Sequence, residues 1–162
     1  MSLPFLKSPQ GQEPVVVEGG FRAAPERVFR AWTDPEEIKK WFGPGGGGLQ
    51  SASIDLRVGG AWRFDFPAAE GRRDSLHGEY LEIDPGRRLV FSWTHLRAFD
   101  DGREEVTPAS QVTVTFEPSD QGAFVRLLHE RIAREAGRLG VGEGWNGAFA
   151  SLERLFATEV AS

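Results

Sequence analysis

The chain has 162 residues, 40% hydrophobic and 27% charged, a composition that fits one globular domain and excludes extended disorder. Nineteen basic and 24 acidic side chains give a net charge of −5, which excludes a general basic field for nucleic acid. The absence of cysteine excludes a disulfide and a thiolate nucleophile. No apolar run approaches the roughly 20 residues that span a bilayer. We therefore expect a cytoplasmic protein with no nucleic-acid partner and no membrane span.

The first quarter of the sequence predicts a strand followed by two short helices. Residues 1–12 form a polar segment that we expect to be a flexible tail, and residues 13–162 are expected to form a single domain. The valine cluster in residues 13–21 favours a strand. Pro25 suits the first position of a helix that ends near residue 33. Asp34 is a good N-cap for a second helix over residues 35–42.

The middle of the chain changes from helical to strand periodicity. The glycine-rich residues 43–48 end the second helix and predict a mobile loop that could gate a site. Alternating apolar residues separated by turn signals then predict six consecutive strands, placed at residues 54–58, 62–66, 76–83, 88–96, 110–116 and 123–131. The polar residues 97–108 are expected to form a rim or lid loop.

The C-terminal segment predicts one long amphipathic helix. Trp145, Phe149, Leu152 and Phe156 recur at helical spacing and define a wide apolar face. Glycines at positions 137, 140, 142 and 144 predict a flexible connection before it. This order of elements predicts an α+β domain in which the helix covers one face of an antiparallel sheet of about seven strands.

Short motifs occur at the predicted elements from residue 15 to residue 156. They are Ala24-Pro25, Val28 to Trp32, Thr33 to Pro35, Trp41 to Pro44, Val58 to Gly60, Gly78 to Pro85, Leu89 to Trp93 and Gly144-Trp145. Together they resemble the START-like (SRPBCC) superfamily, and more narrowly its branch named after the activator of the heat-shock-protein-90 ATPase. The resemblance implies a helix-grip fold, in which a curved sheet wraps the C-terminal helix around a hydrophobic cavity. Relatives of this kind include lipid carriers, cyclases, hydrolases and regulators.

Side-chain parity suggests which residues would line such a cavity. Alternate residues of a strand share one face, so the aromatic residues of two neighbouring strands are expected on the concave side. The candidate ligand-binding residues are Trp62, Phe64, Phe66, Phe91 and Trp93 on the sheet, Trp145, Phe149 and Leu152 on the helix, Trp41 and Phe42 at the mouth, and His95 and His129 as polar anchors. A small-molecule site of this kind requires a volume of roughly 300 to 1,000 Å³.

The sequence offers little support for defined catalytic chemistry. None of the three histidines has a second ligand at metal-binding spacing, so no metal and no other cofactor is expected, and no catalytic residue is assigned. His77 and Glu79 share parity on one predicted strand, which allows a carboxylate–imidazole pair. No serine occupies a nucleophile elbow.

These observations leave three functional hypotheses. The first is binding of a small hydrophobic or amphipathic molecule between the sheet and the C-terminal helix, without a defined activity. The second is a cyclase or hydrolase of an aromatic or polyketide-like substrate, in which His77, Glu79 or His95 moves protons. The third is a protein-interaction module, such as a co-chaperone or stress-linked regulator, that uses an outer face of the sheet or the loop over residues 97–108. The sequence leaves both a monomer and a homodimer open.

Overall fold

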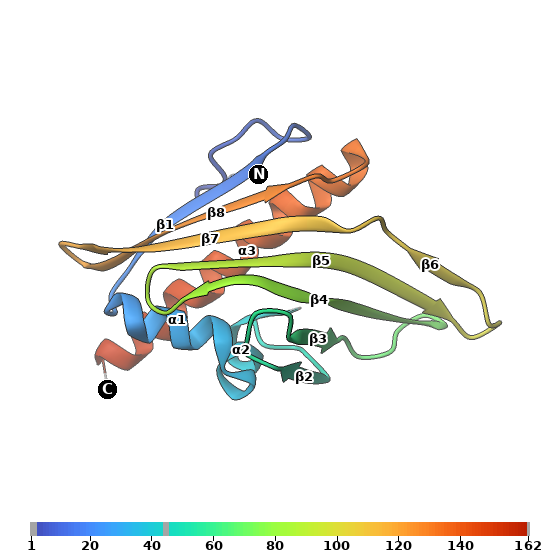
Figure 1. The fold of residues 1–162 in the computed structure, drawn as a ribbon, viewed down its shortest axis with the longest axis horizontal. Helices are drawn as coiled ribbons and strands as arrows, with labels where there is room; N and C mark the ends of the chain where they lie inside the picture. The colour runs from blue at the N-terminus through green and yellow to red at the C-terminus, as the bar shows by residue number, and fades with distance from the viewer. Residues whose placement is uncertain (1–2, 44–45, 162) are drawn as a thin grey trace.

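The computed structural model describes residues 3–43 and 46–161 and folds into one curved antiparallel sheet with a long helix across its concave face (Figure 1). The strand order is β1-β8-β7-β5-β4-β3-β2, and β6 pairs with the far end of β5. The elements are β1 Val15–Phe21, α1 Pro25–Thr33, α2 Pro35–Trp41, β2 Ser51–Ile54, β3 Ala61–Asp65, β4 Arg72–Asp84, β5 Arg88–Phe99, β6 Glu104–Val106, β7 Ser110–Ser119, β8 Gly122–Glu130 and α3 Glu135–Ala161. The predicted α+β helix-grip architecture is confirmed.

The two short helices begin as the sequence predicts. Pro25 and Pro35 occupy first-turn positions, where the missing N–H has no helical partner to lose. Asp34 caps α2 by accepting a hydrogen bond from the backbone N–H of Glu36 at 2.9 Å. The helix ends at Trp41, which leaves Phe42 in extended backbone immediately before the glycine-rich segment. Residues 44 and 45 of that segment, which was predicted to form a mobile loop, lie outside the described residues.

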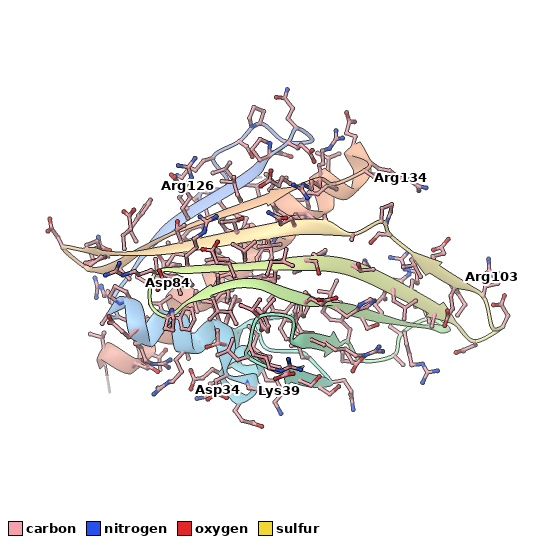
Figure 2. The ribbon with its side chains drawn as sticks, viewed as in Figure 1. Asp34, Lys39, Asp84, Arg103, Arg126 and Arg134 are labelled. Carbon is pink, nitrogen blue, oxygen red and sulfur yellow. The ribbon has the colours of Figure 1, made fainter. Side chains whose placement is uncertain are left out.

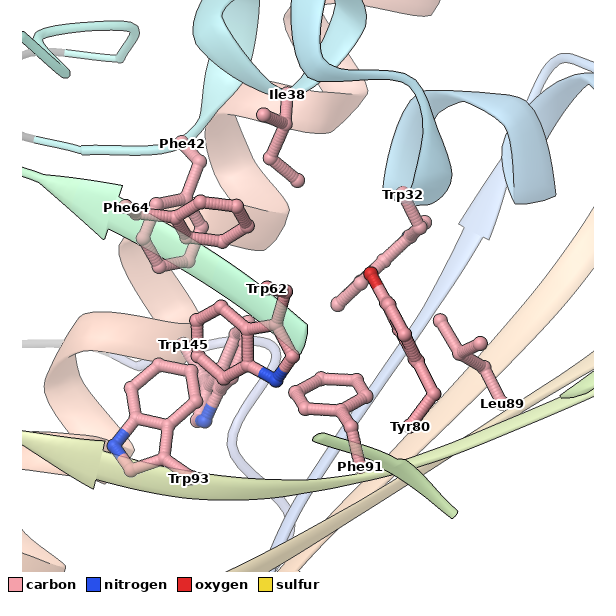
Figure 3. A pocket seen from close by; sticks show the side chains of 10 residues that line it. All are labelled: Trp32, Ile38, Phe42, Trp62, Phe64, Tyr80, Leu89, Phe91, Trp93 and Trp145. Carbon is pink, nitrogen blue, oxygen red and sulfur yellow. The ribbon is translucent and has the colours of Figure 1, made fainter. Parts of the chain in front are cut away.

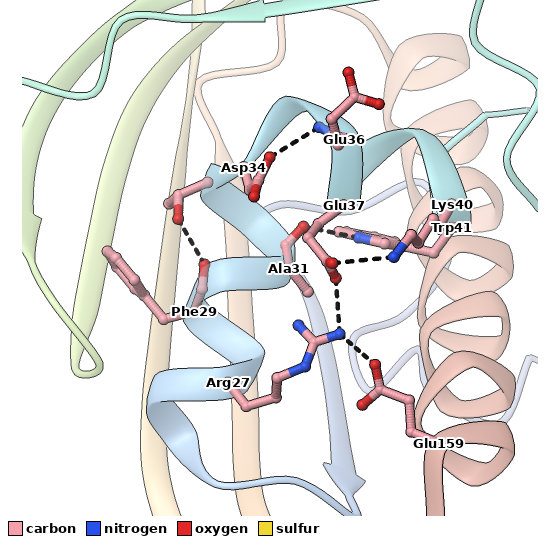
Figure 4. Close-up of polar contacts among 10 residues, drawn as sticks. Arg27, Phe29, Ala31, Asp34, Glu36, Glu37, Lys40, Trp41 and Glu159 are labelled. Carbon is pink, nitrogen blue, oxygen red and sulfur yellow. Dashed lines mark hydrogen bonds and ion pairs between the residues drawn. The ribbon is translucent and has the colours of Figure 1, made fainter. Parts of the chain in front are cut away.

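A salt-bridge cluster fastens these helices to the end of α3 (Figure 4). Arg27 of α1 pairs with Glu37 of α2 at 2.7 Å and also with Glu159 of α3, while Lys40 reaches Glu37 at 3.1 Å. Partial burial alone would raise the pKa of Glu37, but the hydrogen bonds from Arg27 and Lys40 outweigh it and lower that pKa. The cluster therefore holds a charged carboxylate between the three helices and fixes the position of α1 and α2.

The glycine-containing residues 135–144 are helical, which corrects the prediction of a flexible connection before the last helix. They form the first part of α3. Gly142 lies against Leu6 and Val15, so the N-terminal segment packs closely on this part of the helix. Tertiary packing of this kind overrides the low helix propensity of glycine, which costs about 1 kcal/mol per residue relative to alanine.

The predicted loop over residues 97–108 is also corrected, because most of it is a hairpin arm. Strand β5 continues to Phe99, and β6 pairs back so that Leu96 faces Val106 and Ala98 faces Glu104. The arm extends beyond the end of the sheet, with Arg103 at its tip (Figures 1 and 2). The alternation of polar and apolar residues in this stretch fits an exposed two-stranded ribbon better than a loop.

The N-terminal residues that were expected to form a tail contact the edge of β1 and α3. The N–H of Glu18 donates to Phe5 O, and the N–H of Lys7 donates to Val16 O. The N–H of Phe5 donates to Asn146 Oδ1 at 2.8 Å. This segment therefore covers the free edge of β1, which leaves fewer unpaired backbone groups there.

Candidate functional site: an aromatic cavity beneath the C-terminal helix

Ten side chains enclose a small apolar cavity between the sheet, the two short helices and α3 (Figure 3). They are Trp32, Ile38, Phe42, Trp62, Phe64, Tyr80, Leu89, Phe91, Trp93 and Trp145. Strands β3, β4 and β5 supply one side, α1 and α2 with Phe42 supply the other, and Trp145 comes from α3. The cavity thus lies where the sequence predicts a ligand site.

The volume of the cavity is far smaller than expected. It measures about 20 Å³, whereas the expected volume was roughly 300 to 1,000 Å³. A dry cavity of about 150 Å³ accepts benzene, and about 10 to 15 Å³ accepts one water molecule. The prediction of a roomy cavity is therefore wrong for this structure, because large rings that were expected to line a void instead meet one another.

Contacts between aromatic rings account for this closure. The ring of Trp62 lies 4.8 Å from Phe64 and 5.7 Å from Trp93, measured between centroids. Phe42 lies 5.3 Å from Phe64 and 5.8 Å from Trp145. Each such pair contributes about 0.5–1.5 kcal/mol beyond the burial of its area. The closed arrangement is a continuous network of rings that must be interrupted before a ring-sized molecule can enter.

Gly78 allows Trp62 to adopt its position across β4. A Cβ atom at residue 78 would come within 2.0 Å of Ser92 O and 2.8 Å of Trp62 Nε1. Without that atom, the indole N–H of Trp62 reaches across the sheet and donates to Ser92 O at 3.2 Å. Glycine at position 78 therefore leaves the space that the Trp62 indole occupies in the cavity wall.

Two buried wall residues carry hydrogen-bond donors with no acceptor among the described residues. The indole Nε1 of Trp32 is buried and unpaired. The hydroxyl of Tyr80 has no partner within the described part of the chain and points toward Trp32 (Figure 3). Burial raises the pKa of Tyr80, so the hydroxyl keeps its proton at neutral pH. The wall is otherwise made of hydrocarbon side chains and the indoles of Trp62, Trp93 and Trp145.

Six of the twelve predicted ligand-binding residues line the cavity. They are Phe42, Trp62, Phe64, Phe91, Trp93 and Trp145. Trp41, Phe149 and Leu152 are fully buried elsewhere in the core, and Phe66 packs against the core outside the wall. Trp41 instead donates from Nε1 to Ala31 O at 2.9 Å, which fixes α2 against α1 (Figure 4).

The two predicted polar anchors also lie outside the cavity wall. His129 is fully buried behind Trp93 and Trp145, and its burial lowers its pKa to about 3. Trp145 Nε1 donates to His129 Nδ1 at 3.1 Å, so the proton of the neutral ring lies on Nε2. That Nε2–H donates to Ser110 Oγ at 2.7 Å, and the Ser110 hydroxyl donates to Trp93 O at 3.3 Å. With its proton facing Ser110, His129 does not activate that hydroxyl as a base.

His95 belongs to a charged cluster at the base of the arm. Its Nε2 lies 2.8 Å from Asp74 Oδ1, the Arg97 Nε lies 3.0 Å from the same oxygen, and Arg72 Nε lies 3.0 Å from Asp74 Oδ2. Partial burial would raise the pKa of Asp74, but these three hydrogen bonds outweigh it and lower that pKa. The structure therefore gives His95 a carboxylate partner on the same concave face, two residues beyond Trp93.

The proposed proton-moving pair does not face the cavity. His77 and Glu79 alternate with Leu76 and Tyr80 along β4 and so lie on the opposite face of the sheet. Within the described residues, no group of three His, Asp or Glu side chains is arranged to hold a metal ion. No helix in that part of the chain is long and apolar enough to cross a membrane.

Sequence reasoning missed four wall residues, namely Trp32, Ile38, Tyr80 and Leu89. Leu89 has the parity of Phe91 and Trp93 on the same strand, so the argument that selected those two also selects Leu89. Tyr80 follows Glu79 and therefore lies on the opposite face of β4, which is the side of the cavity. Trp32 and Ile38 carry the helical spacing of buried faces, but spacing alone does not indicate what a buried face contacts.

Comparisons with known proteins agree with this architecture. The sequence profile of the family described as Activator of Hsp90 ATPase homolog 1-like protein matches residues 22–157. A solved structure from Chromobacterium violaceum is 29% identical, covers 90% of this chain and 98% of its own, and has a TM-score of 0.69. The AHSA1 protein from Silicibacter pomeroyi is 28% identical over 89% of this chain and 97% of its own, with a TM-score of 0.72.

A more distant structural neighbour is DynU16, a protein of the dynemicin biosynthetic locus. It is 21% identical, and the match covers 91% of this chain and 48% of DynU16, with a TM-score of 0.68. This similarity concerns the fold. Among functionally curated proteins, none matches the sequence.

Proposed function

The chain belongs to the family of activator of Hsp90 ATPase homolog 1-like proteins, and we propose that it binds one small hydrophobic or amphipathic molecule in the aromatic cavity beneath α3. The observation that carries the proposal is the wall itself, which is built from apolar side chains of every layer of the fold. Such a surface gains about 25 cal/mol for each Å² of apolar ligand area that it removes from water.

Entry of a ligand requires the wall to open, because the closed cavity has room for about one water molecule. Phe42 is the wall residue best placed to move. It follows the last residue of α2 and precedes Gly43, whose φ of 103° lies in the region that glycine favours. When Phe42 swings away, its contacts with Phe64, Trp93 and Trp145 are replaced by contacts with the ligand.

This arrangement ties apparent affinity to the stability of the closed form. The apparent dissociation constant equals the intrinsic constant divided by the fraction of open molecules. A variant that weakens the ring contacts of Phe42 therefore binds more tightly, although it has lost apolar surface.

Titration with naphthalene, followed by tryptophan fluorescence, tests the proposal. Phe42→Leu removes ring contacts of about 0.5–1.5 kcal/mol each from the closed form, so we expect its affinity for naphthalene to rise about three- to tenfold. Phe149→Leu is the matched control, because Phe149 is fully buried but outside the wall. Its affinity is expected to stay within about twofold of the wild type. Absence of saturable binding in both the wild type and Phe42→Leu would overturn the proposal.

Binding without turnover is favoured over a cyclase or hydrolase by the chemistry of the wall. The ten wall residues include no histidine and no carboxylate. Their side-chain hydrogen-bond donors are one tyrosine hydroxyl and the indole N–H groups. A general base must lie within hydrogen-bond reach of the proton that it removes. The locus of DynU16 gives biosynthetic chemistry as a second candidate, which would need His95 to reach the ligand from outside the wall.

A further inference from the structure

The cavity wall contains two buried hydrogen-bond donors that have no acceptor in the described protein. Tyr80 is 3% exposed and Trp32 is 4% exposed, and neither the Tyr80 hydroxyl nor the Trp32 Nε1–H has an acceptor among the described residues. Most buried polar groups in folded proteins are hydrogen-bonded, so the fully buried Trp32 N–H is exceptional, and the Tyr80 hydroxyl beside it is a second donor without an acceptor in the described protein. Both residues contact the same small space.

The dimensions of that space indicate what it accepts in the closed form. A volume of about 20 Å³ exceeds the roughly 10 to 15 Å³ that one water molecule needs. The Tyr80 hydroxyl points from β4 into this space toward Trp32 (Figure 3). An oxygen atom placed there would accept the hydrogen bond of this hydroxyl, for which the described protein supplies no acceptor.

The wall also indicates the charge of the group that fits. No lysine, arginine or histidine is among the ten wall residues, and an unpaired ionised group is strongly disfavoured in an apolar site. The arginines that neighbour wall residues along β3 and β5, Arg63 and Arg88, pair with Asp65 and Glu82. Arg72 and Arg97 are paired with Asp74 at the base of the arm. The wall therefore suits a neutral acceptor and not a carboxylate or phosphate.

We propose that the cavity selects neutral ligands with a ring-sized apolar body and one hydrogen-bond-accepting oxygen, such as an aryl ketone, and that the Tyr80 hydroxyl donates to this oxygen. The inference rests on the proposed function and names its ligand class. The hydroxyl of Tyr80 is the selective element, while Trp62, Phe64 and Phe91 contact the apolar body.

Acetophenone and α-methylstyrene form a matched probe pair for this proposal. They have nearly the same shape, but the first carries C=O where the second carries C=CH₂. Tyr80 is the single tyrosine of the chain, so protein labelled with ¹³C at the tyrosine Cζ gives one signal that reports on this hydroxyl. We expect the wild type to bind acetophenone about two- to tenfold more tightly than α-methylstyrene.

The variant Tyr80→Phe removes the donor and keeps the ring. It is expected to lose the preference for acetophenone while binding α-methylstyrene as before, and in the wild type only acetophenone should produce a hydrogen-bonding shift of the Cζ signal. Equal affinity of the wild type for the two probes, or an equal loss of both in Tyr80→Phe, would overturn the proposal.

A second background separates this inference from the proposed function. Leu89→Ala truncates a wall side chain beside Tyr80 and creates room without movement of Phe42 (Figure 3). If the wild type binds neither probe but Leu89→Ala prefers acetophenone, the proposed ligand class is supported and the proposed opening of the wild-type cavity is overturned. If Leu89→Ala binds both probes equally, the role of Tyr80 is wrong even where the cavity opens.

Discussion

Trp145 separates two buried polar regions that differ in how completely they are paired. Behind it, its own Nε1, both nitrogens of His129 and the Ser110 hydroxyl form a closed chain of hydrogen bonds. In front of it, the Tyr80 hydroxyl and the Trp32 indole face a small cavity without an acceptor among the described residues. The two regions lie in the same core and share one indole ring.

The difference separates a structural role from a binding role. A fully paired network has no free donor or acceptor for a ligand, and it contributes by fixing α3 on the sheet. A donor beside a cavity that has no protein acceptor is available to a ligand, and a ligand that supplies the acceptor gains a hydrogen bond. The polar anchor of a ligand is therefore expected at Tyr80 and not at His129, although the sequence drew attention to the histidine.

The largest expected effect comes from breaking the paired region. His129→Ala leaves the Trp145 Nε1–H unpaired and opens a void, so the free energy of unfolding should fall by about 3–5 kcal/mol. Urea denaturation followed by circular dichroism measures this change. A loss below about 1 kcal/mol would contradict the structural role of the network.

Acid should weaken the paired region through the same histidine. The pKa of His129 is about 3 in the folded protein, well below the 6.5 of an unperturbed histidine, so below pH 6.5 the unfolded chain binds a proton that the folded chain does not. This contribution to stability is complete above pH 6.5 and is lost on acidification, at about 1.4 kcal/mol per pH unit and about 3 kcal/mol by pH 4. His129→Gln lacks it, so its unfolding free energy should fall less steeply with acid than that of the wild type; parallel curves would refute the assignment.

The helix that carries Trp145 can be stiffened without altering either region. Gly144 is exposed, and a Cβ atom there meets nothing within 4 Å. Gly144→Ala is therefore expected to raise the free energy of unfolding by about 0.5–1 kcal/mol through helix propensity. Thermal unfolding checks the sign, and a destabilised variant would mean that this part of α3 is not helical in solution.

The smallest effect is expected in the cavity. Tyr80→Phe removes a hydroxyl without a protein partner among the described residues, so the free energy of unfolding should change by less than about 0.5 kcal/mol. The same urea titration used for His129→Ala gives a direct comparison. A loss of more than about 1.5 kcal/mol would show that the hydroxyl is already satisfied inside the protein.

The sequence was informative about elements and less so about how they meet. Prolines, the Asp34 cap and the two-residue alternation are local signals, so the helix starts and most strands were predictable. The helical state of residues 135–144 was not predictable from local signals, because it depends on the packing of Leu6 and Val15 against Gly142.

Parity placed Trp62, Phe64, Phe91 and Trp93 on the correct face, since alternation is a property of the strand itself. It could not show that His129 is already paired with Trp145, or that the rings would fill the expected void. Both facts depend on distances between segments remote in sequence.

The central claim is that the aromatic cavity opens to admit a small apolar molecule, and indole ¹⁵N NMR tests it most directly. The five tryptophans give one side-chain signal each, and four of them line the cavity while Trp41 does not. On titration with naphthalene, we predict saturable shifts of the Trp32, Trp62, Trp93 and Trp145 signals and a much smaller change for Trp41. Signals of the four wall tryptophans that stay unchanged up to the solubility limit of naphthalene would contradict the account.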